Sequence, residues 1–130
     1  MRSRRKSRWT DEEFDRIVKK AIRRVPREIR QRLENVLITV KKRPTAEMLQ
    51  DLDLLPDEEP LGLYWGVSLP ERSLDSPPLY PDTIFLFQEP LEAICETVED
   101  LEREIEITVA HEIAHALGID EERLAELGYE

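Results

Sequence analysis

The stretch of residues 108–121 constrains the fold more than any other part of the chain. It reads T-V-A-H-E-I-A-H-A-L-G-I-D-E and contains the pattern H-E-x-x-H. In a helix with about 3.6 residues per turn, residues four apart lie on one face, so His111 and His115 can reach a single ion from one rigid element. The chain has only 2 histidines, and both lie in this pattern. We therefore expect a helix here that carries a metal site.

The helix predicted around this pattern spans residues 97–117. One stripe of apolar residues predicts the face that packs in the core: Val98, Leu101, Ile105, Val109, Ile113, Ala116 and Leu117. The two histidines lie on a different stripe, which continues Glu104 and Thr108 at the border of that core. Gly118 can adopt the left-handed conformation that ends a helix. A last short helix is predicted at residues 122–127.

A zinc ion in a catalytic site usually has three protein ligands and one open position for water, and two histidines with a carboxylate are an accepted set. The extended pattern H-E-x-x-H-x-x-G-x-x-(His or Asp) places the third ligand at Glu121. Asp120 competes for this role, although its position just before a short helix also suits an N-cap. The predicted metal ligands are therefore His111, His115 and Glu121, with Asp120 as the alternative to Glu121.

Glu112 has a different predicted role. It lies about 100° around the helix axis from His111. At this angle its carboxylate is close enough to touch a metal-bound water without being an obvious ligand. We expect Glu112 to act as a general base.

The chain before the motif begins with predicted helices. Thr10 and Glu13 form a capping box, and apolar residues then recur at helical spacing, which predicts an amphipathic helix over residues 11–24. Pro26 interrupts it, and a shorter helix is predicted at residues 27–33. Thr45 is the expected cap of a brief helix that reaches Leu52.

Three strands are predicted further along the chain. Residues 35–41 are rich in β-branched side chains, and residues 61–67 have strand composition with glycines that suggest a close backbone approach or a bulge. Residues 83–88 form the third strand; it is apolar on both sides, which predicts either burial on both faces or an edge beside a groove. A proline-rich loop is expected at residues 68–82, and a short helical piece at residues 91–95.

The chain of 130 residues has the length of a single domain, and its charge is unevenly distributed. Residues 1–43 hold 16 of the 19 Lys and Arg but only 6 of the 29 acidic residues. Opposite charges on the two halves favour docking of the N-terminal helices against the acidic remainder. We expect residues 1–9 to be a basic disordered arm and residues 10–130 to form the domain. Nucleic acid is not an expected partner.

Cys95 is the only cysteine, so an intramolecular disulfide is excluded and nothing indicates an oxidising compartment. No apolar run approaches the length of a membrane span, and no apolar segment follows the basic N-terminus. The expected location is the cytoplasm, with no membrane as partner. The sequence does not indicate an oligomeric state.

The segment V-A-H-E-I-A-H-A-L-G-I-D-E-E-R-L resembles the active helix of the zincin metallopeptidases. Together with L-G-L-Y-W-G-V-S-L-P-E-R-S and D-T-I-F-L-F-Q-E-P-L, it is similar to a family of small bacterial zincin-like proteins, the minimal metallopeptidases. The likeness runs from about residue 14 to residue 128. Two features differ: the third ligand is Glu rather than Asp, and no methionine follows the motif, which excludes the larger group of metzincins.

This resemblance implies an α+β, zincin-like fold in which a small three-stranded mixed sheet packs against an N-terminal helix and a long C-terminal active-site helix. It also implies Zn²⁺ held by His111, His115 and Glu121, with Glu112 as the base. In zincins, substrate backbone pairs with a sheet edge beside the active helix, so residues 84–88 are the expected edge.

The expected activity is hydrolysis of a bond in a peptide or protein substrate by a zinc metallopeptidase. Zinc would lower the pKa of its bound water to roughly 7, and Glu112 would take the water proton and pass it to the leaving amine. The sequence identifies no second electrophile, and Tyr64, Tyr80 and Tyr129 are left without a role. The alternative is a zinc-binding interaction or regulatory module without efficient peptidase activity.

Overall fold

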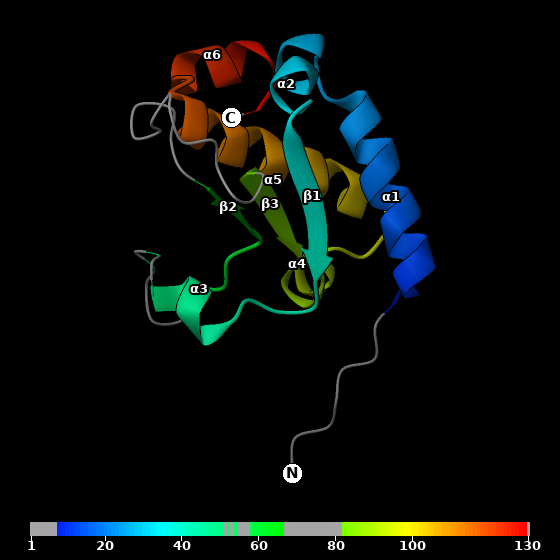
Figure 1. The fold of residues 1–130 in the computed structure, drawn as a ribbon. Helices are drawn as coiled ribbons and strands as arrows, with labels where there is room; N and C mark the ends of the chain where they lie inside the picture. Colours follow the sequence, from blue (N-terminus) through cyan, green and yellow to red (C-terminus); the bar gives the residue numbers. More distant parts are fainter. Residues whose placement is uncertain (1–7, 51, 53, 55–57, 67–81, 130) are drawn as a thin grey trace.

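The computed structural model of the chain describes residues 8–50, 52, 54, 58–66 and 82–129. These residues form an α+β fold, as the sequence predicts, with a three-stranded sheet and helices on it (Figure 1). The elements in chain order are α1 (Asp11–Arg24), α2 (Arg27–Arg32), β1 (Val36–Lys41), α3 (Ala46–Gln50), β2 (Gly62–Trp65), β3 (Asp82–Phe87), α4 (Gln88–Ile94), α5 (Val98–Leu117) and α6 (Glu121–Glu126).

The sheet is mixed because β3 lies between β1 and β2. It runs parallel to β1, with Val36 opposite Asp82, and antiparallel to β2, with Gly62 opposite Leu86. The prediction that residues 84–88 form a sheet edge is therefore wrong. Their apolar character on both sides is that of a central strand, which is covered on both faces and paired on both sides. The edge strand beside α5 is β2.

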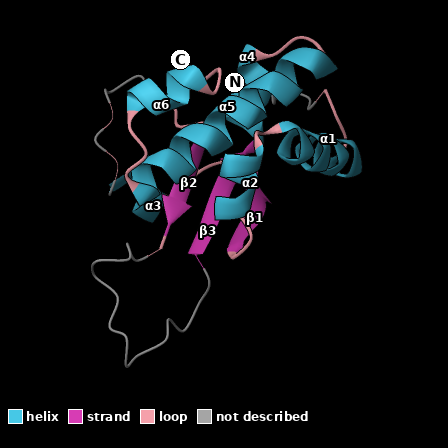
Figure 2. Ribbon diagram, turned by 90° about the horizontal axis from the view of Figure 1, so that it is seen from above, coloured by secondary structure: helices cyan, strands magenta, loops and turns pink. Residues whose placement is uncertain are grey.

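Helices α1 and α5 lie on the same face of the sheet (Figure 2), and Ile84 and Leu86 are fully buried beneath them. On the other face Phe87 and Leu63 pack against Met48 of α3. The main core thus lies between the sheet and the pair of helices α1 and α5.

The predicted core stripe of α5 is confirmed at its centre, where four residues are fully buried: Leu101, Ile105, Val109 and Ile113. It is wrong at Val98, whose side chain is 41% exposed. Val98 is the first residue of α5 and stands one turn outside the packed segment. The histidine face is a separate face of the same helix.

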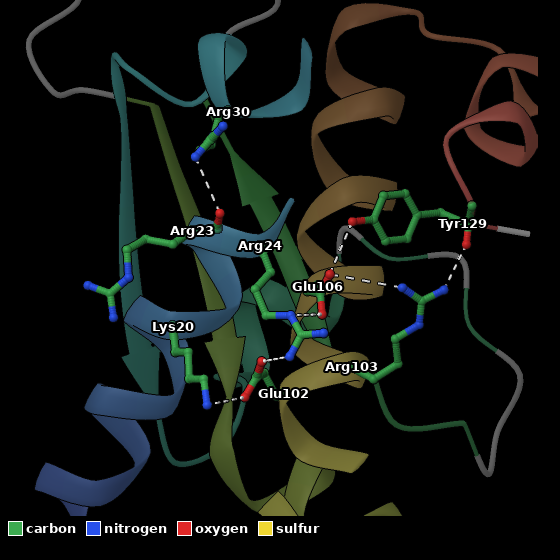
Figure 3. Close-up of polar contacts among 9 residues, drawn as sticks. Lys20, Arg23, Arg24, Arg30, Glu102, Arg103, Glu106 and Tyr129 are labelled. Atoms are coloured by element: carbon green, nitrogen blue, oxygen red, sulfur yellow. Dashed lines mark hydrogen bonds and ion pairs between the residues drawn. The ribbon is translucent and has the colours of Figure 1, made fainter. Parts of the chain in front are cut away.

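Helix α1 docks on α5 through opposite charges (Figure 3). Glu102 and Glu106 of α5 are only 3% and 5% exposed. The guanidinium of Arg24 lies 2.6 Å from the Glu102 carboxylate and 3.9 Å from that of Glu106, and Lys20 lies 3.7 Å from Glu102. A buried carboxylate is costly unless it is paired, so these cations favour the docked position of α1. The docking expected from the charge asymmetry is confirmed at this contact.

The boundaries of several elements differ from the predictions by a few residues. Helix α1 begins and ends as predicted, with the capping box formed by Thr10 and Glu13. Helix α4 begins at Gln88 rather than at residue 91, because a proline in the first turn of a helix, here Pro90, removes no helical hydrogen bond. Most of the proline-rich loop expected at residues 68–82 lies outside the described residues.

The N-terminal arm expected at residues 1–9 is described only at its last two residues. The backbone N–H of Arg8 donates to Glu92, and its guanidinium donates to the carbonyl of Cys95. Trp9 is 9% exposed and packs in the main core. Both residues thus contact the domain. None of the described helices combines the length and apolar character that crossing a bilayer requires.

The glycine at position 62 lets β2 approach α5 closely. A Cβ atom there would lie 2.6 Å from the methyl group of Thr108 and 2.9 Å from the backbone oxygen of Phe85. Both distances are shorter than real Cβ contacts allow, so any larger residue must push the strand away from the helix.

We predict that Gly62→Ala lowers the free energy of unfolding by about 1–3 kcal/mol, the usual cost of overpacking. Urea denaturation measures the change. Thr108→Ala in the same chain should restore part of the loss, because it removes one of the two clashing groups, and Thr108→Ala alone is the control. A Gly62→Ala protein as stable as wild type would show that the close approach does not exist.

Candidate metal centre

The C-terminal half of α5 carries all three residues of the H-E-x-x-H pattern. The helix is fixed at both ends: the Thr97 side chain accepts from the Asp100 N–H at its start, and Gly118 ends it with φ 73°. The left-handed conformation of Gly118 suits a residue without a side chain. The motif therefore lies on a continuous helix, as the sequence predicts.

The imidazole of His111 has a ring nitrogen that could bind a metal ion. Its Nε2 atom is buried and has no hydrogen-bond partner among the described residues. Buried polar atoms in proteins are nearly always hydrogen-bonded, and a neutral imidazole nitrogen is a preferred ligand of zinc. The orphaned nitrogen fits a metal ion. His115 is exposed and follows one turn later on the same side of the helix.

The carboxylate of Glu112 is held by the edge strand. Its Oε1 atom accepts a hydrogen bond of 2.8 Å from the backbone N–H of Tyr64 in β2. Burial raises the pKa of Glu112 above its ordinary value, against the opposing effects of this hydrogen bond and of the two histidines. A carboxyl group with a raised pKa is better suited to exchange a proton near neutral pH.

The register of β2 explains why the Tyr64 N–H reaches α5. The Leu61 carbonyl accepts a hydrogen bond of 3.0 Å from the Phe87 N–H, so the hydrogen-bonded pairs with β3 fall on odd-numbered residues of this segment. The backbone groups of the even-numbered residues, Gly62 and Tyr64, therefore point away from β3. One of them donates to Glu112.

A cavity of about 700 Å³ lies between β2 and α5, a volume typical of ligand sites. His111, Glu112 and His115 all line it. Glu104 and Thr108 line it as well, so the second stripe predicted on this helix is confirmed as the wall of the cavity. Most of the remaining wall is apolar and comes from β2 and the segments before it.

The third predicted ligand is not brought to the histidines. In residues 8–50, 52, 54, 58–66 and 82–129, no three His, Cys, Asp or Glu side chains form a group that could hold a metal ion. Asp120 is the N-cap of α6, where its carboxylate accepts from the Arg123 N–H at 2.8 Å. Glu121 is exposed in the first turn of that helix. Its role as a ligand stays a prediction.

Helix α6 and the residues after it form contacts with α2 and α5. Arg123 donates to Glu28 of α2 through two nitrogen atoms. Arg103 of α5 donates to the Gly128 carbonyl at 2.7 Å and lies 5.2 Å from the centre of the Tyr129 ring. These contacts position the segment that carries Asp120 and Glu121 relative to α2 and α5.

Two of the three tyrosines considered as electrophiles have hydroxyl groups engaged elsewhere. The hydroxyl of Tyr64 donates to Asp82, and that of Tyr129 donates to the buried Glu106 at 3.3 Å. Burial, together with the charge of Glu106, raises the pKa of Tyr129 to about 12. Tyr80 lies outside the described residues.

The contribution of β2 to the site was only partly visible in the sequence. The glycines of L-G-L-Y-W-G indicated a close backbone approach, which Gly62 makes to Thr108. The sequence does not reveal the backbone N–H of Tyr64, because a main-chain donor is independent of residue type. The strand order that makes β2 the edge strand exposes this donor.

Comparisons with known proteins agree with this fold. A family model described as zincin-like metallopeptidase matches residues 33–129. No curated protein matches the sequence. Among solved structures, the chain is similar to a conserved hypothetical protein from Thermo thermophilus, with a TM-score of 0.51 and 22% identity over 90% of this chain and 98% of the other. At that identity the similarity supports the fold alone.

The N-cap of α6 provides a test of the geometry around Asp120. We predict that Asp120→Ala lowers the free energy of unfolding by about 1 kcal/mol, whereas Asp120→Asn leaves it nearly unchanged, because asparagine caps a helix as well as aspartate does. Thermal denaturation of the metal-free protein measures both. Equal losses for the two variants would mean that the carboxylate has a role other than capping.

Proposed function

The chain belongs to the zincin-like metallopeptidase family, and from this we propose that it is a zinc-dependent hydrolase that cleaves peptide bonds in a peptide or protein substrate. The main support is the orphaned Nε2 atom of His111. The next residue, Glu112, has a carboxyl group with a raised pKa. His111, Glu112 and His115 all line one cavity.

The proposed zinc ligands are His111, His115 and Glu121. When bound, zinc would supply Lewis-acid activation of a water molecule and of the scissile carbonyl. Glu121 is one methylene longer than the aspartate of the family pattern, and it lies only three residues after Gly118. Binding of the ion by Glu121 therefore requires this short turn to change its conformation.

Glu112 is the proposed general base. The Tyr64 N–H holds one carboxylate oxygen, which orients the group and leaves Oε2 for proton transfer. Glu112 takes a proton from the attacking water and later gives it to the amine that leaves when the C–N bond breaks. Its raised pKa favours both directions of this exchange.

The proposed substrate lies in the cavity beside β2, the edge strand next to α5. This strand replaces residues 84–88 as the element along which an extended peptide would lie. The Tyr64 N–H of this strand binds Glu112, so a peptide beside the strand would run past the motif.

The second candidate function is a zinc-binding module without efficient peptidase activity. It is favoured by the tyrosine hydroxyls, because those of Tyr64 and Tyr129 are already engaged as donors to Asp82 and Glu106. A protein of this kind would bind zinc through the same residues and stabilise no oxyanion.

We predict that Glu112→Gln lowers the rate of peptide hydrolysis by about 100- to 10,000-fold, the usual contribution of a general base, while zinc stays bound in a 1:1 ratio. His111→Ala should remove the zinc. Cleavage of a peptide library is followed by mass spectrometry, and metal content by elemental analysis. If wild type cleaves no better than Glu112→Gln while both bind zinc, the protein is a zinc-binding module without efficient peptidase activity.

The third ligand is tested by a matched pair of variants. We predict that Glu121→Gln lowers zinc affinity by more than about tenfold, since even indirect partners of a metal site contribute that much. Glu122→Gln removes the same charge from the next exposed residue and should change nothing. Competition with a chelating dye measures the affinities. Loss of zinc in Asp120→Asn but not in Glu121→Gln would assign the ligand to Asp120.

A further inference from the structure

Glu104 brings a second carboxylate into the wall of the cavity, about two helical turns before His111. It is half-buried, and it makes no hydrogen bond or ion pair with the rest of the described chain. On the same helix, the carboxylates of Glu102 and Glu106 both face Arg24. A half-buried carboxylate without a cation is a favourable site for one, because partial burial strengthens the attraction.

Strand β2 runs beside α5 in the same direction. This alignment indicates which part of β2 lies beside Glu104. Gly62 lies against Thr108, and two residues later Tyr64 donates to Glu112. Two strand residues rise by about 6.6 Å and four helical residues by about 6 Å. Every second residue of the strand therefore lies beside every fourth residue of the helix. Extended back by the same interval, Pro60 lies level with Glu104, and both line the cavity.

The cavity is therefore a trough with Glu104 towards one end and the motif towards the other. Glu104 and Glu112 are eight residues apart, or about 12 Å along the helix. An extended peptide covers this distance with three to four residues at about 3.3 Å each. The wall between them is apolar, with Leu61 from the segment before β2 and Ile107 from α5.

We propose that the protein selects peptides with a lysine or arginine about three residues from the bond that is cleaved and with large apolar side chains between them. The cation pairs with Glu104, and the apolar side chains pack on Leu61 and Ile107. This substrate class rests on the proposed hydrolase function. Electrostatic steering acts in the same direction, because residues 44–130 hold 23 of the 29 acidic residues and only 3 of the 19 Lys and Arg.

The test uses the zinc-loaded full chain and seven-residue peptides with a leucine-rich centre, in which one position in turn is Lys, Gln or Glu. The value of kcat/KM is measured for wild type, and the Kd of the same peptides is measured by fluorescence anisotropy for the Glu112→Gln protein. We expect a preference for Lys over Glu of about tenfold at the position three residues from the cleaved bond, in both measurements.

Charge reversal identifies the residue responsible. Glu104→Lys should invert the preference to Glu, and Glu104→Gln, which keeps the shape of the side chain, should abolish it. Glu34→Lys makes the same change of charge on an exposed turn outside the cavity and should leave the preference intact. Circular dichroism confirms that each variant is folded.

The outcomes separate the inference from the proposed function. A Lys preference that survives Glu104→Lys, or cleavage without any charge preference, overturns the inference and leaves the hydrolase in place. Charge-dependent binding to Glu112→Gln without cleavage by wild type supports the trough and overturns the hydrolase. Neither binding nor cleavage of any peptide overturns both.

Discussion

The candidate site depends on the contact between one strand and one helix. Gly62 brings the backbone of β2 within reach of Thr108, and the Tyr64 N–H then binds Glu112. The first contact is steric and requires a residue without a side chain; the second is a hydrogen bond to a partly buried carboxylate, which is stronger than one in water. The strand thereby orients the Glu112 carboxylate and forms part of the wall of the cavity next to it.

The part of the chain outside the family match contributes to this arrangement. The match begins at residue 33, yet α1 and α2 supply fully buried core residues such as Phe14 and Ile29. Arg24 also compensates the two buried carboxylates of α5. A helix with paired charges on one side, a core stripe on another and two histidines on a third depends on its neighbours for stability. Its neighbours therefore determine whether the face with the two histidines is presented.

The helices and the motif could be predicted from the sequence because their signals are local. Capping at Thr10, the stop at Gly118 and the spacing of His111 and His115 all depend on residues close together in the chain. Strand order could not be predicted this way, because residues 83–88 have the same composition whether they are central or at an edge. The position of Glu121 depends on the turn after α5, and a turn of a few residues has several conformations that the sequence does not distinguish.

Glu106 has partners from widely separated parts of the chain. It accepts from Tyr129, lies near Arg103 on its own helix and faces Arg24 from α1. Tyr129 also packs with Ala110 and Ala114, on the turns of α5 that hold His111 and His115. During synthesis the helix that carries His111 and His115 emerges before Tyr129, so it completes its packing only after Tyr129 has been added.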